Sequence, residues 1–388
     1  MSSTDMPDIK TLAGCPQILV ADDQADVLDA LRLLLQPEGF RTEMVRSPAA
    51  VLEALSKREF DLLLMDLNYA RDTTSGREGL DLLSQVRTVD EQLPVVVMTG
   101  WGTMEVAIEA LRHGVRDFIQ KPWDNDRVVA MVRALTDARR GERHATARHT
   151  RELDQARDIQ RHLLPPELPS RPGWDLAAVC EAAASVGGDT YDVIALDDRW
   201  LALCVGDVAG KGIPAALLAA NLQAAVRSAV GDGRMPADVC ARVNRTLCPT
   251  LPDDRFVSFF FAILDTRDGT FHYCNAGHNP PVLVHSDGRN EVLAEGGTVL
   301  GICLDSRYAE RTVRMASGDT LVLYTDGITE ACDATGDEFG ERRLTGIIIA
   351  AAGAGDAGHV RDCVLEAVRT FSAGRHDDDQ TLMVVCRR

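Results

Sequence analysis

Short apolar runs separated by helical patterns constrain the N-terminal third of the chain most strongly. The runs are Ile18–Ala21, Leu62–Met65, Val95–Met98 and Phe118–Ile119, and none contains a polar residue. Between them, apolar residues recur at helical spacing, as from 27 to 35. Strands that are apolar on both faces and alternate with helices form a parallel sheet with both faces covered. The sequence therefore predicts a doubly wound parallel α/β domain.

Polar side chains stand where these strands end. They are Asp22, Asp23, Asp66, Thr99 and Lys121. Functional groups of such sheets gather at the carboxyl ends of the strands. A carboxylate there can accept a phosphoryl group as an aspartyl-phosphate, with magnesium held by the other acids. Any one of these residues alone is most simply a solvated strand end, but the set predicts a phosphoryl-accepting site.

Residues Gln17–Arg139 resemble the receiver domain of bacterial response regulators. The resemblance implies five parallel strands, a sensor histidine kinase as partner, and Asp66 as the phospho-acceptor. It assigns Asp22 and Asp23, together with Asp66, to a magnesium ion. It also assigns Thr99 and Lys121 to contacts with the phosphoryl group.

Three details follow from the same resemblance. Phe118 occupies the aromatic switch position, although an aromatic residue there is otherwise expected to pack in the core. The Lys121–Pro122 bond is expected to be cis. The loop Asn68–Gly79 is longer and more polar than usual in receivers, which leaves the lifetime of the acyl phosphate open.

A glycine-rich turn organises the C-terminal half of the chain. The apolar run Leu201–Val205 predicts a buried strand, and Asp207 follows it. Glycines at 206, 210 and 212 allow a sharp turn, and Pro214 suits the first turn of a helix. A carboxylate on this turn can reach a metal, although Asp–Gly turns are often purely structural.

Three further acids lie next to apolar runs. Asp189 belongs to the segment VGGDTYD, Asp326 follows Leu321–Leu323, and Asp378 precedes Leu382–Val385. Carboxylate oxygens are the ligands that hard divalent cations prefer, and two such cations can clamp a phosphoester for hydrolysis. Together with Asp207, these acids predict a metal centre.

Five motifs give the region from Pro172 to Arg388 its resemblance to the PPM-type serine/threonine protein phosphatases, in their SpoIIE-like branch. In chain order they are VGGDTYD, GDVAGKGIPAAL, NAGHNPP, YTDGITEA and DDQTLMVV. Hairpin and turn signals favour an α+β domain, and the resemblance specifies a β-sandwich flanked by helices.

The resemblance also assigns roles within the site. Asp207 is expected to bridge two magnesium or manganese ions, with Asp189, Asp326 and Asp378 completing the carboxylate set and the Val208 carbonyl assisting. Asp379 is a weaker candidate, because neighbouring families can place asparagine there.

Asn275 and His278 occupy family positions without a defined role. A structural turn is the leading alternative for His278, because a lone histidine needs a located partner to be assigned to catalysis.

The segment from Asp126 to Leu164 is predicted to be one helix, ended by Pro165–Pro166. Leu153, Ala156, Ile159 and Leu163 form an apolar stripe at helical spacing. Two interpretations remain open: a helix lying on its own domain, or a parallel two-chain coil that makes a homodimer. Residues Gln155–Pro169 also resemble the linker that often enters SpoIIE-like domains.

Composition excludes several classes of protein. The net charge of −18 over 388 residues argues against nucleic acid or an anionic membrane as the main partner. No basic helix–turn–helix pattern indicates a DNA-binding output. The 10 cysteines form no C-x-x-C pair, and no apolar run approaches the roughly 20 residues of a membrane helix. We expect a cytoplasmic protein with reduced thiols.

The sequence thus predicts a receiver domain over 16–139, a helical linker over 140–170 and a phosphatase domain over 171–388. Phosphorylation of Asp66 is expected to control dephosphorylation of a STAS-domain antagonist in a sigma-factor partner switch, a substrate that comes from the family resemblance alone. The competing prediction is a non-catalytic adaptor that uses a degenerate phosphatase domain to bind a partner. Retention of all four carboxylates favours the enzyme.

Overall fold

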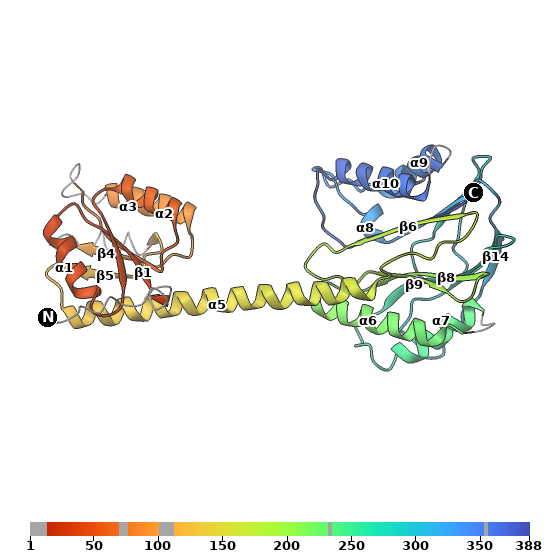
Figure 1. Cartoon of the computed structure of the whole chain (residues 1–388), viewed down its shortest axis with the longest axis horizontal. Helices are drawn as coiled ribbons and strands as arrows, with labels where there is room; N and C mark the ends of the chain where they lie inside the picture. Colours follow the sequence, from red (N-terminus) through yellow and green to blue (C-terminus); the bar gives the residue numbers. More distant parts are fainter. Residues whose placement is uncertain (1–13, 70–76, 101–111, 232–234, 353–355) are drawn as a thin grey trace, which may run out of the picture. The chain divides into compact units, whose positions relative to one another are not determined.

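The computed structural model describes residues 14–69, 77–100, 112–231, 235–352 and 356–388 (Figure 1). The chain divides into two compact units, Met1–Thr150 and Arg151–Arg388. Among the described residues, no helix combines the length and the apolar character needed to cross a bilayer.

The N-terminal unit is built on a five-stranded, all-parallel sheet, as predicted. In spatial order its strands are β2 (Arg41–Val45), β1 (Gln17–Ala21), β3 (Leu62–Asp66), β4 (Val95–Thr99) and β5 (Asp117–Gln120). The central strands β1, β3 and β4 are almost completely buried, which is why their sequences are continuous apolar runs. Asp66 and Thr99 are the last residues of their strands, so both stand at the same edge of the sheet.

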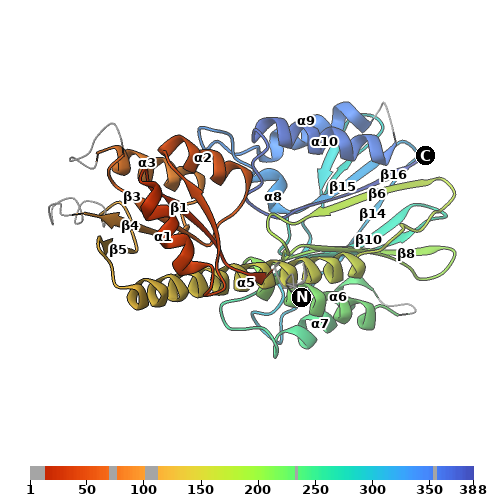
Figure 2. The ribbon, with the colours of Figure 1, turned by 60° about the vertical axis from the view of Figure 1, so that its left-hand side comes forward.

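Helices cover both faces of this sheet (Figure 2). The helices are α1 (Ala25–Leu35), α2 (Pro48–Lys57), α3 (Arg77–Val89) and the first part of α5 (Asn125–Leu163). Leu31 of α1 and Val132 of α5 share one apolar cluster, while Val51 of α2 and Leu83 of α3 belong to the other. Separate clusters on the two faces define a doubly wound domain.

The long helix α5 is held to the N-terminal unit by a buried ion pair. Arg139 lies on α5, and its Nη2 atom donates to both carboxylate oxygens of Asp90, at 3.0 and 2.8 Å. Gly141 does not interrupt the helix, and α5 ends at Leu163, ahead of Pro165. Its bounds agree with the predicted helix to within one residue at each end.

The C-terminal unit contains two mainly antiparallel sheets, as expected for the predicted sandwich. One has the order β13 (Gly296–Gly297), β10 (Thr270–Ala276), β9 (Val257–Asp265), β8 (Trp200–Val208) and β7 (Thr190–Ala195), with β14 (Arg311–Arg314) also pairing with β10. The other has the order β12 (Asn290–Val292), β11 (Val282–Val284), β15 (Thr320–Tyr324), β16 (Gln380–Arg387) and β6 (Trp174–Glu181). Phe260 and Tyr273 from the first sheet and Leu323 and Met383 from the second share one buried cluster.

Helices flank the two sheets on their outer sides (Figure 1). Helices α6 (Gly212–Ala229) and α7 (Pro236–Leu247) pack on the first sheet, and α9 (Gly340–Ala352) and α10 (Ala357–Phe371) pack on the second. The short α8 (Asp326–Thr329) follows β15 directly. Close packing of α6 is possible because alanines such as Ala215 and Ala219 face the sheet.

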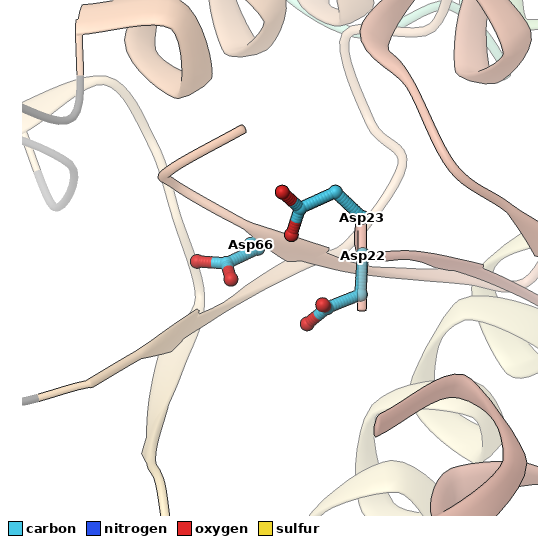
Figure 3. Close-up of side chains that lie close together, drawn as sticks. All are labelled: Asp22, Asp23 and Asp66. Carbon is cyan, nitrogen blue, oxygen red and sulfur yellow. The ribbon is translucent and has the colours of Figure 1, made fainter. Parts of the chain in front are cut away.

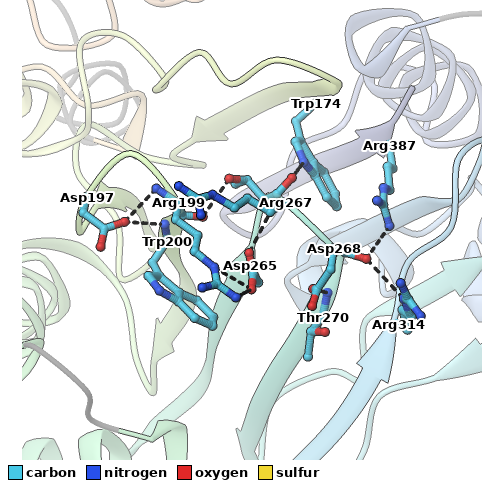
Figure 4. Close-up of polar contacts among 11 residues, drawn as sticks. Trp174, Asp197, Arg199, Trp200, Asp265, Arg267, Asp268, Thr270, Arg314 and Arg387 are labelled. Atoms are coloured by element: carbon cyan, nitrogen blue, oxygen red, sulfur yellow. Dashed lines mark hydrogen bonds and ion pairs between the residues drawn. The ribbon is translucent and has the colours of Figure 1, made fainter.

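A polar network ties the sheets together around the β9–β10 hairpin (Figure 4). The indole N–H of Trp174 on β6 donates to the Thr266 carbonyl at 2.8 Å, and Arg387 on β16 donates to the Asp268 carbonyl at 2.7 Å. Arg199 donates from its Nε to the Asp265 carboxylate at 2.8 Å. These bonds satisfy the hairpin turn that the sequence predicted at 265–269.

Replacing Phe260 with alanine tests the inter-sheet core. Phe260 is fully buried and stacks on Tyr273 with ring centroids 5.5 Å apart. We expect Phe260→Ala to cost about 3–5 kcal/mol, the usual range for removing a buried phenyl group. Leu217→Ala, at a side chain 67% exposed on α6, is the control with little cost. Hydrogen-exchange mass spectrometry should show faster exchange in β9 and β10 and in β15 and β16, which share the cluster, and parental protection in Phe260→Ala would contradict this assignment.

Candidate functional site

Three carboxylates converge at the edge of the N-terminal sheet (Figure 3). Asp22, Asp23 and Asp66 each offer an oxygen, and these oxygens lie within 4.8 Å of one another. Asp22 and Asp66 are buried, because β1 and β3 deliver them to the floor of the site. Burial raises the pKa of Asp22, while its bonds to Lys121 and the Gln24 N–H oppose that rise. An oxygen-rich cluster of this kind fits a hard divalent cation.

Lys121 supplies the positive charge of this site. Its Nζ lies 2.6 Å from Asp22 Oδ2 and 2.7 Å from Asp66 Oδ2. Burial lowers the pKa of this lysine, but the hydrogen bonds to the two carboxylates outweigh burial and leave the pKa raised. Lys121 is therefore a fixed cation beside the predicted phospho-acceptor.

Thr99 stands at the end of the adjacent strand. Its hydroxyl donates to the Gly100 carbonyl at 2.8 Å rather than to a carboxylate, so contact with a phosphoryl group on Asp66 requires the hydroxyl to rotate.

The other receiver predictions have separate outcomes. The Lys121–Pro122 bond is cis, as expected. Phe118 is 39% exposed on β5 rather than packed in the core. Most of the predicted long loop, residues 70–76, lies outside the described residues.

Four loops or strand ends of the C-terminal unit carry the second carboxylate set. Asp207 lies within β8 and pairs with Ser258, so it is inside the strand rather than on the turn after it. Asp189 precedes β7, Asp326 begins α8, and Asp378 precedes β16. The Val208 carbonyl adjoins the same loops, because a Cβ on Gly188 would lie 2.8 Å from its oxygen.

Asp189 is the buried member of this set, and Asp207 beside it is half-buried. Their carboxyl groups share a hydrogen bond. Thr325 Oγ1 also donates to Asp189 Oδ2 at 2.7 Å, and accepts from the Thr381 N–H at 2.9 Å. Burial and the neighbouring Asp207 charge raise the pKa of Asp189.

Burial, reinforced by repulsion between the acids, determines the electrostatics of the site. Burial, followed by the charges of Asp326 and Asp378, raises the pKa of Asp207 to about 7. The pKa of Asp326 is also raised, by burial and by Asp378. Carboxylates held together in this way attract divalent cations strongly. Among the described residues, the receiver triad brings three carboxylate oxygens within 4.8 Å of one another, whereas no three acids of this second set lie that close together.

Asp379 uses its carboxylate to hold a neighbouring loop. Its oxygens accept the Ala183 N–H at 2.8 Å and the Gly188 N–H at 2.6 Å. A Cβ on Gly187 would lie 2.2 Å from Asp379 Oδ2, so this loop needs glycine for the close approach. The arrangement favours a role in positioning the loop that carries Asp189, and the metal-ligand role predicted for Asp379 stays untested.

Asn275 and His278 hold a turn between β10 and β11. Asn275 Nδ2 donates to the His278 carbonyl at 3.0 Å and its Oδ1 accepts the His278 N–H at 2.7 Å. The His278 ring bonds to Ser258 through Nδ1 at 2.8 Å. Burial lowers the pKa of His278 to about 4. These contacts support the structural-turn alternative.

Sequence reasoning missed three contributors to the second site. Thr325 orients Asp189, Gln160 of α5 bonds to Gly187, and Lys211 forms an ion pair with Asp378. Thr325 lies inside the motif YTDGITEA, and Lys211 lies inside GDVAGKGIPAAL. Both residues therefore belong to motifs that the sequence revealed, but neither was assigned a role.

Comparison with known proteins identifies both units. Residues 18–133 match the family model "Response regulator receiver domain", and residues 197–388 match "Stage II sporulation protein E (SpoIIE)". Protein IcfG of Synechocystis sp. is 32% identical over 221 residues, covering 50% of this chain and 35% of that protein. Phosphoserine phosphatase RsbU of Bacillus subtilis is 31% identical over 180 residues, covering 46% of this chain and 53% of that protein.

A solved structure agrees with these sequence matches. The crystal structure of the RsbU and RsbW domains of Rv1364c from Mycobacterium tuberculosis aligns with a TM-score of 0.51 and 29% identity, covering 57% of this chain and 62% of that one. The chain spans about a third to a half of the length of the two curated relatives named above.

Fold, site and comparisons together define a receiver domain joined to a phosphatase-type domain. The N-terminal domain is thus similar to response-regulator receiver domains, and the C-terminal domain is similar to the SpoIIE family of phosphatase domains.

The raised pKa of Asp207 predicts how the site responds to pH. Asp207 is protonated below about pH 7, so a metal ion must displace a proton there and its affinity should fall about 10-fold per pH unit below that value. In the metal-free protein, the raised pKa means that the folded state favours protonated Asp207. Its contribution to the free energy of unfolding is fully present below the pKa of this residue in the unfolded chain, and it is lost as pH rises through about 7.

Calorimetric titration with Mn²⁺ at pH 6 and pH 8 measures this effect. The Asp207→Asn variant reports the receiver site alone, so the difference from the parent isolates the second site. Equal affinity of that site at both pH values would contradict the prediction.

Proposed function

We propose that this chain is a response regulator in which phosphorylation of Asp66 controls a metal-dependent serine/threonine protein phosphatase. The observation that carries the proposal is the carboxylate set Asp189, Asp207, Asp326 and Asp378, in which burial and then the charges of Asp326 and Asp378 raise the pKa of Asp207 to about 7. A sensor histidine kinase acts upstream. The substrate is a phosphorylated STAS-domain antagonist, and the chain works in the cytoplasm; similarity to Phosphoserine phosphatase RsbU supports this part of the proposal.

The receiver residues divide the first reaction between them. Asp66 attacks the phosphorus of the donor with a carboxylate oxygen, and the bond from phosphorus to the donor breaks. Lys121, already 2.7 Å from Asp66, offers its charge to the phosphoryl oxygens. Asp22 and Asp23, together with Asp66, would hold a magnesium ion, which would supply further positive charge to the phosphoryl oxygens.

The phosphatase residues bind two Mg²⁺ or Mn²⁺ ions and position them. Asp207 would be shared between the ions, and Asp189, Asp326 and Asp378 would supply the remaining carboxylate ligands. When bound, the ions supply Lewis acidity to the attacking water and to the leaving oxygen. Thr325 fixes the orientation of Asp189 through its hydroxyl, so the carboxylate needs little reorganisation when the site is loaded.

A non-catalytic adaptor remains the alternative function. An adaptor needs a binding surface but no metal centre, and its buried like charges would only destabilise the domain. Retention of the four acids, and of the threonine that orients one of them, favours the enzyme.

The linker helix α5 is the proposed connection between signal and output. At its C-terminal end, Gln160 Nε2 donates to the Gly187 carbonyl at 2.7 Å and Gln160 Oε1 accepts the Gly187 N–H at 3.1 Å. Arg157 donates to the Ser185 carbonyl at 2.9 Å. These contacts attach α5 to the loop that leads to Asp189, so a displacement of the helix would reach a metal ligand.

A homodimer along α5 is part of the proposal. Ile159 is 66% exposed and Leu163 39% exposed, and both lie on the predicted apolar stripe. An apolar stripe left in solvent supports the two-chain coil, because pairing would bury it.

The proposed function is tested by one assay on the full chain. With Mn²⁺ and a phosphoserine STAS-domain protein, phosphate release should change by roughly 5- to 150-fold when a small-molecule phosphodonor labels the receiver, the usual scale of allosteric coupling. Asp66→Asn should remove both the label and the response.

Asp207→Asn should reduce turnover by at least about 100-fold, as loss of an electrostatic clamp group does. Undiminished labelling of Asp66→Asn, or full activity of Asp207→Asn, would refute the respective assignment.

A proline at Ala147 tests the role of α5. Ala147 lies within the helix and far along the chain from both sets of acids. Ala147→Pro should break the helix, while Asp66 is still labelled and the basal rate of phosphate release is retained. Labelling of Asp66 should no longer change the rate of phosphate release. The matched control is Ala147→Ser, which keeps the helix. If Asp66 phosphorylation still changes phosphate release in Ala147→Pro as it does in the parent, the helix mechanism is wrong, and direct contact between the domains would have to carry the signal.

A further inference from the structure

We propose that Lys211 binds the phosphoryl group of the phosphoprotein substrate. The proposal rests on the proposed phosphatase function and names the recognition residue of the same site. Lys211 comes from the turn after β8, between two glycines with positive φ, Gly210 at 110° and Gly212 at 72°. It precedes the first residue of α6 in extended conformation, so its side chain leaves the helix at its start.

The side chain crosses from this turn to the opposite loop. Lys211 Nζ donates to the Asp377 carbonyl at 2.7 Å and lies 3.0 Å from Asp378 Oδ2. An ammonium group carries three N–H donors, and the structure records two protein acceptors for them. The side chain is 62% exposed, so its tip is accessible from solvent at the rim of the carboxylate set.

Lys211 is also distinguished by charge. Within the part of the chain that the structure describes, it makes the one ion pair recorded with Asp189, Asp207, Asp326, Asp378 or Asp379. Its charge lowers the pKa of Asp326 against the effects of burial and Asp378, so it acts on a second predicted ligand. A cation in this position is therefore adjacent to the metal centre without being inside it.

A hollow of about 160 Å³ lies beside this cation. Its walls include Lys211, Glu330, Cys332, Arg375 and Asp378. The acids make the hollow unfavourable for an anion by themselves, and bound divalent ions would reverse that balance. Lys211 and Arg375 would then contribute two positive charges to the lining of the hollow.

The chemistry of phosphoryl transfer explains why such a cation is needed. Negative charge is spread over three equatorial oxygens of the transferred group, and metal ions contact only some of them. A lysine ammonium is a compact point charge on a flexible stem, which suits the remaining oxygen. A phosphoserine or phosphothreonine side chain would thus be seated with its phosphoryl group between the metal ions and Lys211.

The alternative role for Lys211 is a brace between the two loops. Lys211→Met removes the charge and keeps the length, Lys211→Arg keeps the charge, and Lys57→Met, at an exposed helical ion pair with Glu53, is the matched control. Calorimetry on the Mn²⁺-loaded full chain measures the affinity for inorganic phosphate and, separately, for Mn²⁺. Steady-state assays with a phosphoserine protein measure kcat and KM.

We expect Lys211→Met to weaken phosphate binding by about 10- to 100-fold, the scale of one hydrogen bond between charged groups. KM should rise by a similar factor, and Lys211→Arg should restore much of the loss. Mn²⁺ affinity should not fall, because Lys211→Met removes a cation that pairs with Asp378 and repels the metal ions. Unchanged phosphate affinity with weakened Mn²⁺ binding would establish the brace and overturn the proposal.

The two proposals fail in different ways. A parent that binds phosphate but releases none from phosphoserine protein refutes the phosphatase function and leaves the Lys211 site standing. A parent that turns over normally with no effect of Lys211→Met refutes the Lys211 assignment alone.

Discussion

Withdrawal from water of carboxylates that lie close together is the physical constraint common to both sites. In the receiver, Lys121 contacts Asp22 and Asp66 directly, so the cluster carries its own counter-charge. In the phosphatase domain Asp189 and Asp207 share a hydrogen bond, and the pKa of Asp207 rises to about 7. The first site is thus poised around a fixed lysine for a single ion, whereas the second has an unbalanced charge that divalent ions would neutralise. This difference follows from where the basic residue lies, since Lys211 stands at the rim rather than between the acids.

The sequence predicted those elements whose burial is uniform. Strands β1, β3 and β4 are buried on both faces, so their apolar runs identify them, whereas the edge strand β2 (Arg41–Val45) is partly exposed and gives no such run. The acids of both sites could be named because metal chemistry requires that residue type. Local sequence could not show that Asp207 lies inside β8, because the length of a strand depends on its partner, here Ser258 on β9.

Long-range contacts account for the rest of what sequence reasoning missed. Asp379 reaches Gly188 across 191 positions, and Lys211 reaches Asp377 across 166. Neither contact has a periodicity or a spacing rule, because each arises only after two sheets have paired. The glycines of the GGD motif were given no role of their own, and the structure supplies a packing reason at Gly187, where the Asp379 carboxylate leaves no room for a Cβ.

The loop before Asp189 connects these observations with the proposed control of the enzyme. It is held on one side by Gln160 and Arg157 of α5, and on the other by Asp379 next to the metal ligand Asp378 proposed above. A signal can act only on a state that it stabilises differently from its alternative. Movement of α5 would change the Gly187 contacts and with them the position of Asp189, so the two states would differ in metal affinity. Carboxylates that repel one another separate readily when no cation holds them together. A small change in the position of the loop would therefore produce a larger difference in metal affinity between the two states. Control through metal affinity therefore requires no contact between Asp66 and the phosphatase site.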